Sequence, residues 1–252
     1  MSYCLGIKTQ DGLVMASDSR TSAGDQVNVT QKMHLFETPG ERVFTLLNSG
    51  SLSLSQSVIT LLRLDFNAGR GLAEAPTMYD AARVVGETIR RVSDLDREYL
   101  ERDGLKFNVH MLLGGQIKEE SGELFPPELY LVYPQGNPIR ATSDTPYIQI
   151  GENKYGRPIL DRGIRYGQTS SEEAVKYALI SIDSTMRSNS TVGPPIDLLV
   201  YDKDTLKLDG HRRMHANDPD LIAVHKQWDM ALRKAVQELP VIKFGDSVVS
   251  DR

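Results

Sequence analysis

The feature that most constrains this fold is a β-hairpin predicted at the very start of the chain. Two apolar runs, residues 3–8 and 13–17, flank a turn that contains the step Asp11-Gly12. An Asp-Gly step between apolar runs is a strong short-range signal for a hairpin. Because a strand begins at residue 3, the sequence predicts that residue 2 is held by folded structure, unlike a solvated terminal tail.

The rest of the chain has the strand and helix order of an α+β protein. Apolar alternation predicts further strands at residues 32–37, 42–47, 107–113, 129–133 and 196–201. Helical spacing and a capping box at Ser170 predict helices at residues 52–64, 77–102, 170–186 and 221–239. The polar residues 20–30 are expected to form a loop. We expect one domain over residues 1–245, with helices on both sides of antiparallel sheets, and a flexible tail at 246–252.

Composition and charge narrow the function classes. The 252 residues are enough for one large domain with a substantial core. A net charge of −5 argues against a nucleic-acid partner, because phosphate binding needs a concentrated cationic surface. No apolar run approaches the ~20 residues of a membrane span, and the first residues lack a secretory signal. With Cys4 as the only cysteine, we expect no disulfide, metal or cofactor, and a cytoplasmic enzyme or assembly subunit.

Ser2 is the residue that removal of Met1 would expose. A terminal serine carries a nucleophilic hydroxyl and an α-amine whose pKa is ~8, so it holds both a nucleophile and a base. Serine is also common as the second residue of proteins, so the position alone does not establish a catalytic role.

Two charged residues support the catalytic interpretation of Ser2. Asp18 ends an apolar strand and Lys32 opens the next one. If the two strands are neighbours in one sheet, the side chains can face each other near Ser2. An ammonium there would favour the neutral α-amine and stabilise a developing alkoxide, and a carboxylate would hold the ammonium in place. The alternative is an ordinary solvated ion pair.

Several segments resemble the proteasome β-subunit family of N-terminal nucleophile hydrolases. Residues 2–20 are similar to the start of that family, and Lys32-Met33-His34 is similar to its K-I-H strand. The residues Asn48-Ser49-Gly50-Ser51 stand where the family has a glycine-bearing turn before its first long helix. Further matches keep the family's order, so the resemblance spans about residues 2–205. Within the family, residues 186–199 and the Ser-Tyr-Cys start are most similar to Anbu, the ancestral bacterial proteasome-like β subunit.

The resemblance implies a four-layer αββα sandwich of two antiparallel sheets flanked by helices. It also implies peptide-bond hydrolysis through an acyl-enzyme, with Ser2 as the nucleophile and its own amine as the base. Lys32 would lower the pKa of that amine, Asp18 would orient Lys32, and the amide of Gly50 would bind the oxyanion. The implied partners are peptide or protein substrates and copies of the same chain in a ring or ring-like assembly. An ATPase or accessory partner is left open.

The chain departs from the family pattern around the implied nucleophile. It has serine where threonine is usual, and the family serine that supports the amine is replaced around residues 151–153. The other supporting positions correspond to Ser188 and Thr191. An altered supporting shell leaves the rate open. Two alternatives therefore remain: a non-proteolytic amidase of the same mechanism, or a catalytically silent scaffold subunit.

Two further features are interpreted as structural. His211 and His215 are four residues apart, as metal ligands on a helix can be, but Gly210 and Pro219 argue against a continuous helix there. We expect surface histidines. Cys4 should point to the opposite face of its strand from Tyr3, as a packed core thiol.

Overall fold

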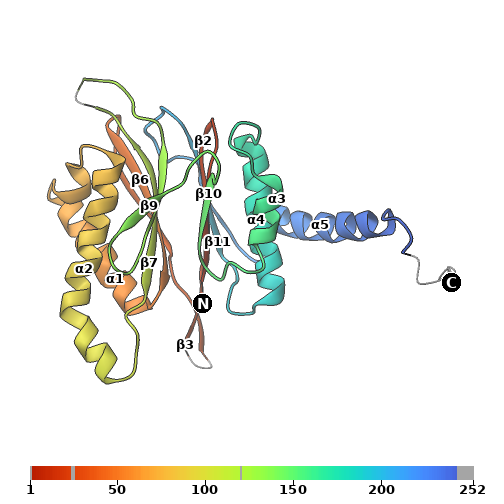
Figure 1. Ribbon diagram of the computed structural model, residues 1–252, viewed down its shortest axis with the longest axis horizontal. Helices are drawn as coiled ribbons and strands as arrows, with labels where there is room; N and C mark the ends of the chain where they lie inside the picture. The colour runs from red at the N-terminus through yellow and green to blue at the C-terminus, as the bar shows by residue number, and fades with distance from the viewer. Residues whose placement is uncertain (1, 24–25, 120, 243–252) are drawn as a thin grey trace.

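Two antiparallel sheets lie face to face, with helices covering the outer face of each (Figure 1). This computed structural model describes residues 2–23, 26–119 and 121–242. Helices α1 (Leu52–Asn67) and α2 (Met78–Arg102) cover one sheet, and α3 (Arg157–Gly163) and α4 (Ser171–Ser188) cover the other. The predicted four-layer αββα sandwich is therefore confirmed.

The first sheet combines strands from the start of the chain with strands from its second half. Its strands, in spatial order, are β10 (Tyr147–Gly151), β1 (Tyr3–Lys8), β2 (Gly12–Asp18), β11 (Ile196–Asp202) and β12 (His211–Met214). The predicted hairpin is present as β1 and β2, which pair from Cys4↔Ser17 to Lys8↔Leu13. Strand β1 lies between β10 and β2, so it is paired with a neighbouring strand on both sides.

The second sheet follows the chain in simple order. Its strands are β5 (Met33–Thr38), β6 (Arg42–Gly50), β7 (Val109–Ile117), β8 (Glu128–Val132) and β9 (Pro138–Arg140). A separate hairpin of β3 (Arg20–Ala23) and β4 (Gln26–Val29) connects the first sheet to the second. The expectation of a loop at residues 20–30 is wrong, because these short polar strands lack the apolar alternation by which strands are recognised.

The helices are α1 (Leu52–Asn67), a 3-10 turn (Gly71–Ala73), α2 (Met78–Arg102), α3 (Arg157–Gly163), α4 (Ser171–Ser188) and α5 (Pro219–Gln237). Thr77 caps α2 by accepting a hydrogen bond from the amide of Asp80. The predicted capping box is present at α4, where Ser170 and Glu173 each satisfy an amide of the other. The sequence did not predict α3, β9, β10 or β12. The predicted tail at 246–252 lies outside the described residues.

Strand alternation sorts the buried side chains into three apolar layers. Tyr3, Leu5 and Ile7 point from β1 toward α3 and α4, whereas Cys4 points into the space between the sheets. This confirms Cys4 as a packed core thiol. At Gly6 a Cβ atom would lie 2.7 Å from the side chain of Leu129, so glycine lets the two sheets approach closely.

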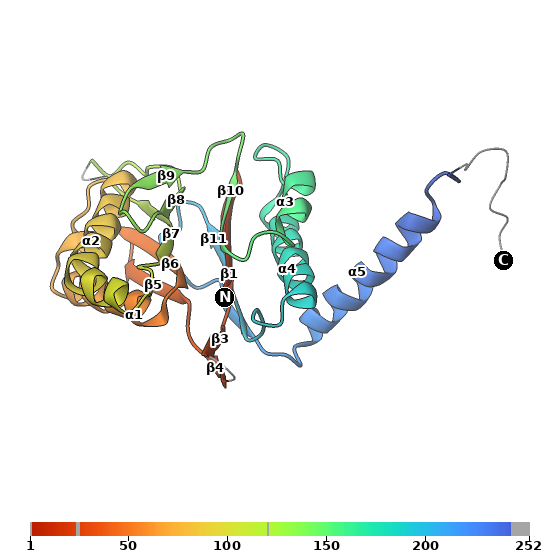
Figure 2. The same ribbon diagram turned by 60° about the horizontal axis from the view of Figure 1, so that its bottom comes forward.

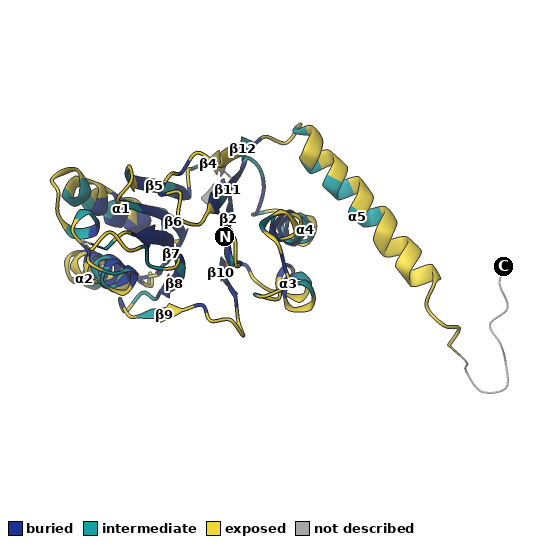
Figure 3. Ribbon diagram, turned by 90° about the horizontal axis from the view of Figure 1, so that it is seen from above, coloured by how far each residue is buried: buried dark blue, intermediate teal, exposed yellow. Residues whose placement is uncertain are grey.

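Helix α5 projects away from the sandwich (Figure 2). It has no buried residue, and the burial colouring of Figure 3 shows it largely exposed. Among the described residues, no helix is both long enough and apolar enough to span a membrane.

Candidate active site

Ser2 lies at the start of β1, where the space between the two sheets opens into a cavity. Its side chain is largely buried, and its carbonyl oxygen accepts a hydrogen bond of 2.7 Å from the amide of Glu152. The cavity has a volume of about 670 Å³. Beside Ser2 it is lined by Gly50, His110, Tyr133 and Arg157, among others. A hydroxyl that borders a cavity of this size can reach a bound substrate.

Asp18 and Lys32 form a buried ion pair close to Ser2. The Lys32 Nζ atom lies 2.7 Å from Asp18 Oδ1, and the same oxygen accepts a 2.9 Å hydrogen bond from the amide of Tyr3. Asp18 is 0% exposed and Lys32 is 3% exposed. One carboxylate oxygen therefore connects the ammonium to the residue next to Ser2.

The structure brings these side chains together by a route other than the one expected. Asp18 ends β2 of the first sheet, whereas Lys32 directly precedes β5 of the second, so the two strands are not neighbours in one sheet. The β3–β4 hairpin leads the chain from the first sheet to the second. At its base the backbone amide of Thr30 donates a hydrogen bond to the carbonyl of Ser19. Lys32 Nζ also donates to the carbonyl of Arg20 at 2.6 Å.

Burial has the largest effect on the Asp18 carboxyl and raises its pKa above the ordinary value, although the Lys32 ammonium and the amides of Tyr3 and Gly193 oppose this effect. Its two oxygens accept four hydrogen bonds, from Lys32 Nζ and from the amides of Tyr3, Arg20 and Gly193. These donors stabilise the charged carboxylate. We therefore treat the pair as ammonium and carboxylate.

Gly50 ends β6 on another side of the same cavity. Its φ of 109° is a value that residues with a side chain rarely adopt, and a Cβ atom there would lie 2.3 Å from the carbonyl oxygen of Asn108. Glycine is therefore required at this position, and its backbone borders the cavity that Ser2 lines.

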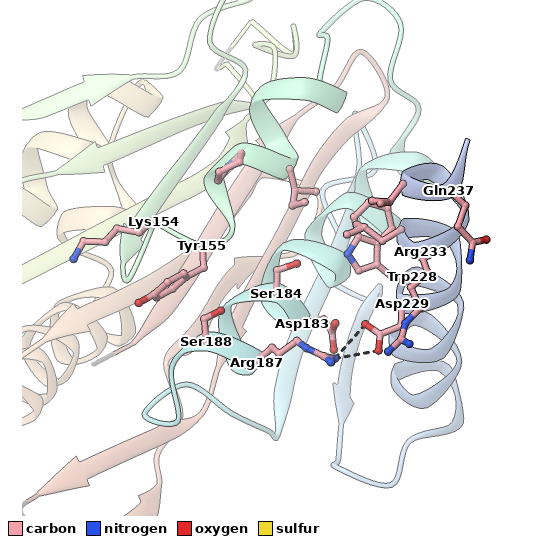
Figure 4. Close-up of a pocket in the computed structure, with 14 residues that line it drawn as sticks. Lys154, Tyr155, Asp183, Ser184, Arg187, Ser188, Trp228, Asp229, Arg233 and Gln237 are labelled. Atoms are coloured by element: carbon pink, nitrogen blue, oxygen red, sulfur yellow. Dashed lines mark hydrogen bonds and ion pairs between the residues drawn. The ribbon is translucent and has the colours of Figure 1, made fainter. Parts of the chain in front are cut away.

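The two supporting residues proposed from sequence differ in position. Ser188 is exposed and lines a separate groove between α4 and α5, at the end marked by Tyr155 (Figure 4). Thr191 instead donates a 2.6 Å hydrogen bond to Asn189 Oδ1, and Asn189 Nδ2 donates to Glu152 Oε2 at 3.2 Å. Thr191 is thus connected to the neighbourhood of Ser2, whereas Ser188 is not in this chain of contacts.

Sequence reasoning missed several residues around the cavity. Glu152 and Asn189 do not line the cavity but lie behind Ser2, where the pairing of β10 with β1 sets Tyr3 opposite Gly151 and Asn189 donates to Glu152. His110 and Arg157 line the cavity, and burial lowers the pKa of His110. The helical start of α3, with proline at its first turn, was the signal that could have located Arg157.

Cys4 is poorly suited to act as a competing nucleophile. It is fully buried, and its thiol contacts the carbonyl oxygen of Asn48. Burial raises the pKa of the Cys4 thiol above its ordinary value, with an opposing effect from Lys32. A buried thiol held in its neutral form is inert.

His211 and His215, the two histidines considered from sequence, are both exposed, and a third histidine, His225, lies on another element. His211 on β12 lies 3.2 Å from Asp197, and His225 on α5 lies 2.8 Å from Asp183. Within the part of the chain that the structure describes, no group of three His, Cys, Asp or Glu residues is arranged to hold a metal ion.

Comparison with known proteins decides the family. The family model described as "Proteasome subunit" matches residues 2–201. The chain belongs to the proteasome subunit family. Proteasome subunits beta of Haloquadratum walsbyi and Haloferax volcanii are 28% and 27% identical to it over 209 residues, which cover 82% of this chain and 76% of theirs.

Comparison with solved structures shows which members of this family the chain is similar to. An Anbu structure from Pseudomonas aeruginosa, described as a helical assembly, is 43% identical, with 97% of this chain and 100% of that chain covered and a TM-score of 0.90. Anbu from Yersinia bercovieri is 41% identical, with 96% and 99% covered and a TM-score of 0.88. The resemblance to Anbu is therefore confirmed.

Proposed function

We propose that this proteasome-family chain is an N-terminal nucleophile peptidase in which Ser2 attacks peptide bonds. The observation that supports it most is the shared oxygen of Asp18, which accepts hydrogen bonds from both Lys32 Nζ and the amide of Tyr3. This contact places a buried ammonium two hydrogen bonds away from the peptide unit that follows Ser2.

The proposed reaction begins once removal of Met1 has freed the Ser2 amine. The neutral amine takes the hydroxyl proton, directly or through a water, while Oγ bonds to the substrate carbonyl carbon. The resulting oxyanion accepts a hydrogen bond from the Gly50 amide. The C–N bond then breaks, the leaving amine takes the proton, and an ester on Ser2 remains. Water attacks the ester with the amine as base, which releases the acid and restores the hydroxyl.

Lys32 would act through its charge. Two of its three N–H groups are directed to Asp18 and to the carbonyl of Arg20. In the proposed mechanism the third would donate to the Ser2 hydroxyl, where a buried positive charge would stabilise the developing alkoxide and disfavour a second positive charge on the amine. Asp18 keeps this ammonium charged and fixes its position.

We also propose that the chain assembles with copies of itself through α5. The exposed apolar side chains of this helix include Ile222, Met230, Leu232 and Val236, on a segment that leaves the sandwich. Apolar side chains gathered on a projecting helix are typical of an association surface. The P. aeruginosa relative is described as a helical assembly, which supports a second copy as the occupant.

Hydrolysis by the Met1-free protein tests the function. We expect cleavage within a mixed peptide library and no cleavage by Ser2→Ala, with both proteins equally folded by thermal melting. Cleavage confined to γ-glutamyl or isopeptide substrates would favour the non-proteolytic amidase. A free Ser2 amine with no hydrolysis of either class and no modification of Ser2 by an epoxyketone would favour the silent scaffold.

A further inference from the structure

The cavity beside Ser2 has a lining that suits a negatively charged ligand. Its volume of about 670 Å³ lies within the ~300–1,000 Å³ of ordinary ligand sites. Among the described residues that line it, none is Asp or Glu, whereas Arg157 contributes a permanent positive charge. Leu131 and Ile150 are the only aliphatic residues of this lining, so a large apolar group has little complementary surface there.

Arg157 brings its charge to the cavity from the side of the first sheet. It is the first residue of α3, shortly after β10 has paired with β1. Its Nε atom lies 3.5 Å from Asp161 Oδ2, but the two side chains are 58% and 53% exposed, so this ion pair is weak. Asp161 also accepts a hydrogen bond from the hydroxyl of Tyr147. The Arg157 guanidinium therefore keeps donors with which it can bind a second carboxylate, in the planar, two-bond geometry that arginine favours.

His110 and Tyr133 line the same cavity from the second sheet. His110 stands opposite Ser49 in the pairing of β7 with β6, and the His110 and Tyr133 rings meet edge to face with their centroids 6.3 Å apart. In the part of the chain that the structure describes, neither side chain forms a hydrogen bond with another residue. Burial lowers the pKa of His110, so its ring is neutral and keeps one N–H to donate. The second sheet thus offers an N–H and an O–H donor across the cavity from Arg157.

We propose that this cavity binds a carboxylate of the peptide beside the bond that Ser2 attacks. Arg157 supplies the charge, and His110 and Tyr133 supply further donors from the opposite sheet. The inference rests on the proposed function of Ser2 and names its substrate class. The substrates are peptides in which an acidic side chain or a free C-terminal carboxylate lies next to the cleaved bond.

Binding to Ser2→Ala, which has no nucleophile, tests the inference without cleavage. The probes are two pairs of N-acetylated tetra-alanine peptides. One pair ends in a free carboxylate or in an amide, and the other carries glutamate or glutamine at its third position and ends in an amide. We expect a carboxylate peptide to bind about tenfold more tightly than its amide partner in calorimetric titrations near physiological salt, since hydrogen bonds to charged groups are the stronger ones. The pair that shows the preference identifies the source as a chain end or a side chain.

Variants of Arg157 locate the site. Arg157→Gln should remove the preference for the carboxylate. Arg157→Glu should reverse it, so that a peptide with lysine at the third position binds more tightly than the glutamate peptide. Arg162→Gln is the matched control and should keep the full preference, because Arg162 is an exposed arginine of the same helix that is not among the residues lining the cavity.

Equal affinity within both pairs of peptides, or no measurable binding of either carboxylate peptide, would overturn the inference. A preference for the carboxylate that survives in Arg157→Glu would also overturn it, because the ligand would then bind elsewhere. The proposed function fails separately. Carboxylate binding to Ser2→Ala, combined with no hydrolysis by the Met1-free protein, would reject Ser2 as nucleophile and retain the binding site. Hydrolysis by Ser2 with no effect of a nearby carboxylate would reject the role of the cavity alone.

Discussion

Asp18 and Lys32 form a buried ion pair that joins the two sheets of the sandwich at 2.7 Å. Asp18 comes from the end of β2 and Lys32 from the residue before β5. The pair therefore fixes the relative position of the sheets at the edge of the cavity that Ser2 lines. The stability of the fold and the proposed reaction of Ser2 both depend on these two side chains, and suitable variants can separate the two effects.

Lys32→Met should lower the free energy of unfolding by about 3–5 kcal/mol, because it leaves the Asp18 carboxylate buried without its partner. The double variant Asp18→Asn/Lys32→Met removes both charges and should regain most of that loss. Urea denaturation measures both. Epoxyketone labelling of Ser2 should be absent in both variants, and labelling regained together with stability would show that the pair is only structural.

Gly50→Ala should lose at least about 100-fold in labelling rate, since the backbone must move and with it a proposed oxyanion donor. Gly40→Ala is the matched control. Both glycines have positive φ, but a Cβ atom at Gly40 has no heavy atom within 4 Å, whereas one at Gly50 meets Asn108. Gly40→Ala should lose only about 1 kcal/mol of stability and keep its labelling rate. Equal effects of the two substitutions would remove the case for Gly50.

Leu232→Asp on α5 should reduce the size of the assembly without lowering the melting temperature of the subunit. The Leu232 side chain is 46% exposed, so the charge costs little within one chain but a great deal in an apolar interface. Leu95→Asp is the control, because Leu95 is 65% exposed on α2, in the opposite outer layer. Sedimentation velocity measures the size. Dissociation by Leu95→Asp alone would place the interface elsewhere.

Acidification should destabilise the fold partly through His34. Burial lowers the pKa of His34, whose Nε2 lies 2.9 Å from Asn48 Oδ1, so the folded state favours the neutral ring. As the pH falls below ~6.5, the unfolded chain binds the proton first, and stability is lost. His110 contributes in the same direction.

His34→Gln keeps a donor for Asn48 and removes the titrating group. We therefore expect a smaller loss of stability between about pH 7.5 and about pH 5.5 in this variant than in the unsubstituted protein, measured by urea denaturation. His215→Gln, at an exposed position, controls for a change of composition alone. An unchanged pH dependence in His34→Gln would show that His34 does not contribute.

The sequence predicted the parts of the site that depend on local signals. The Asp11-Gly12 turn identified the first hairpin, in which Ser2 directly precedes β1 and Asp18 ends the neighbouring β2. Lys32 followed from its place at the start of an apolar strand, although its contact with Asp18 crosses between sheets. These residues were recognised because each belongs to a segment with clear apolar alternation.

The remaining residues depend on contacts between distant segments. Strand β10 is five residues long and ends in Gly151, so its pairing with β1 is not visible in a local pattern. Glu152 reaches Ser2 only through that pairing, and Asn189 reaches Glu152 only after α4 has packed against the first sheet. The family pattern matches Ser188 to a supporting position, but Ser188 is exposed at the end of α4, and the next residue, Asn189, makes the contact with Glu152. Adjacent residues at the end of a helix point in different directions.

The most direct test of the account is the site of modification after treatment with a peptide epoxyketone, read by mass spectrometry of the intact N-terminus and its fragments. The account predicts that Met1 is absent, that the adduct lies on Ser2, and that Ser2→Ala and Lys32→Met remain unmodified. An adduct on another residue, or equal modification of the unsubstituted protein and Ser2→Ala, would contradict it.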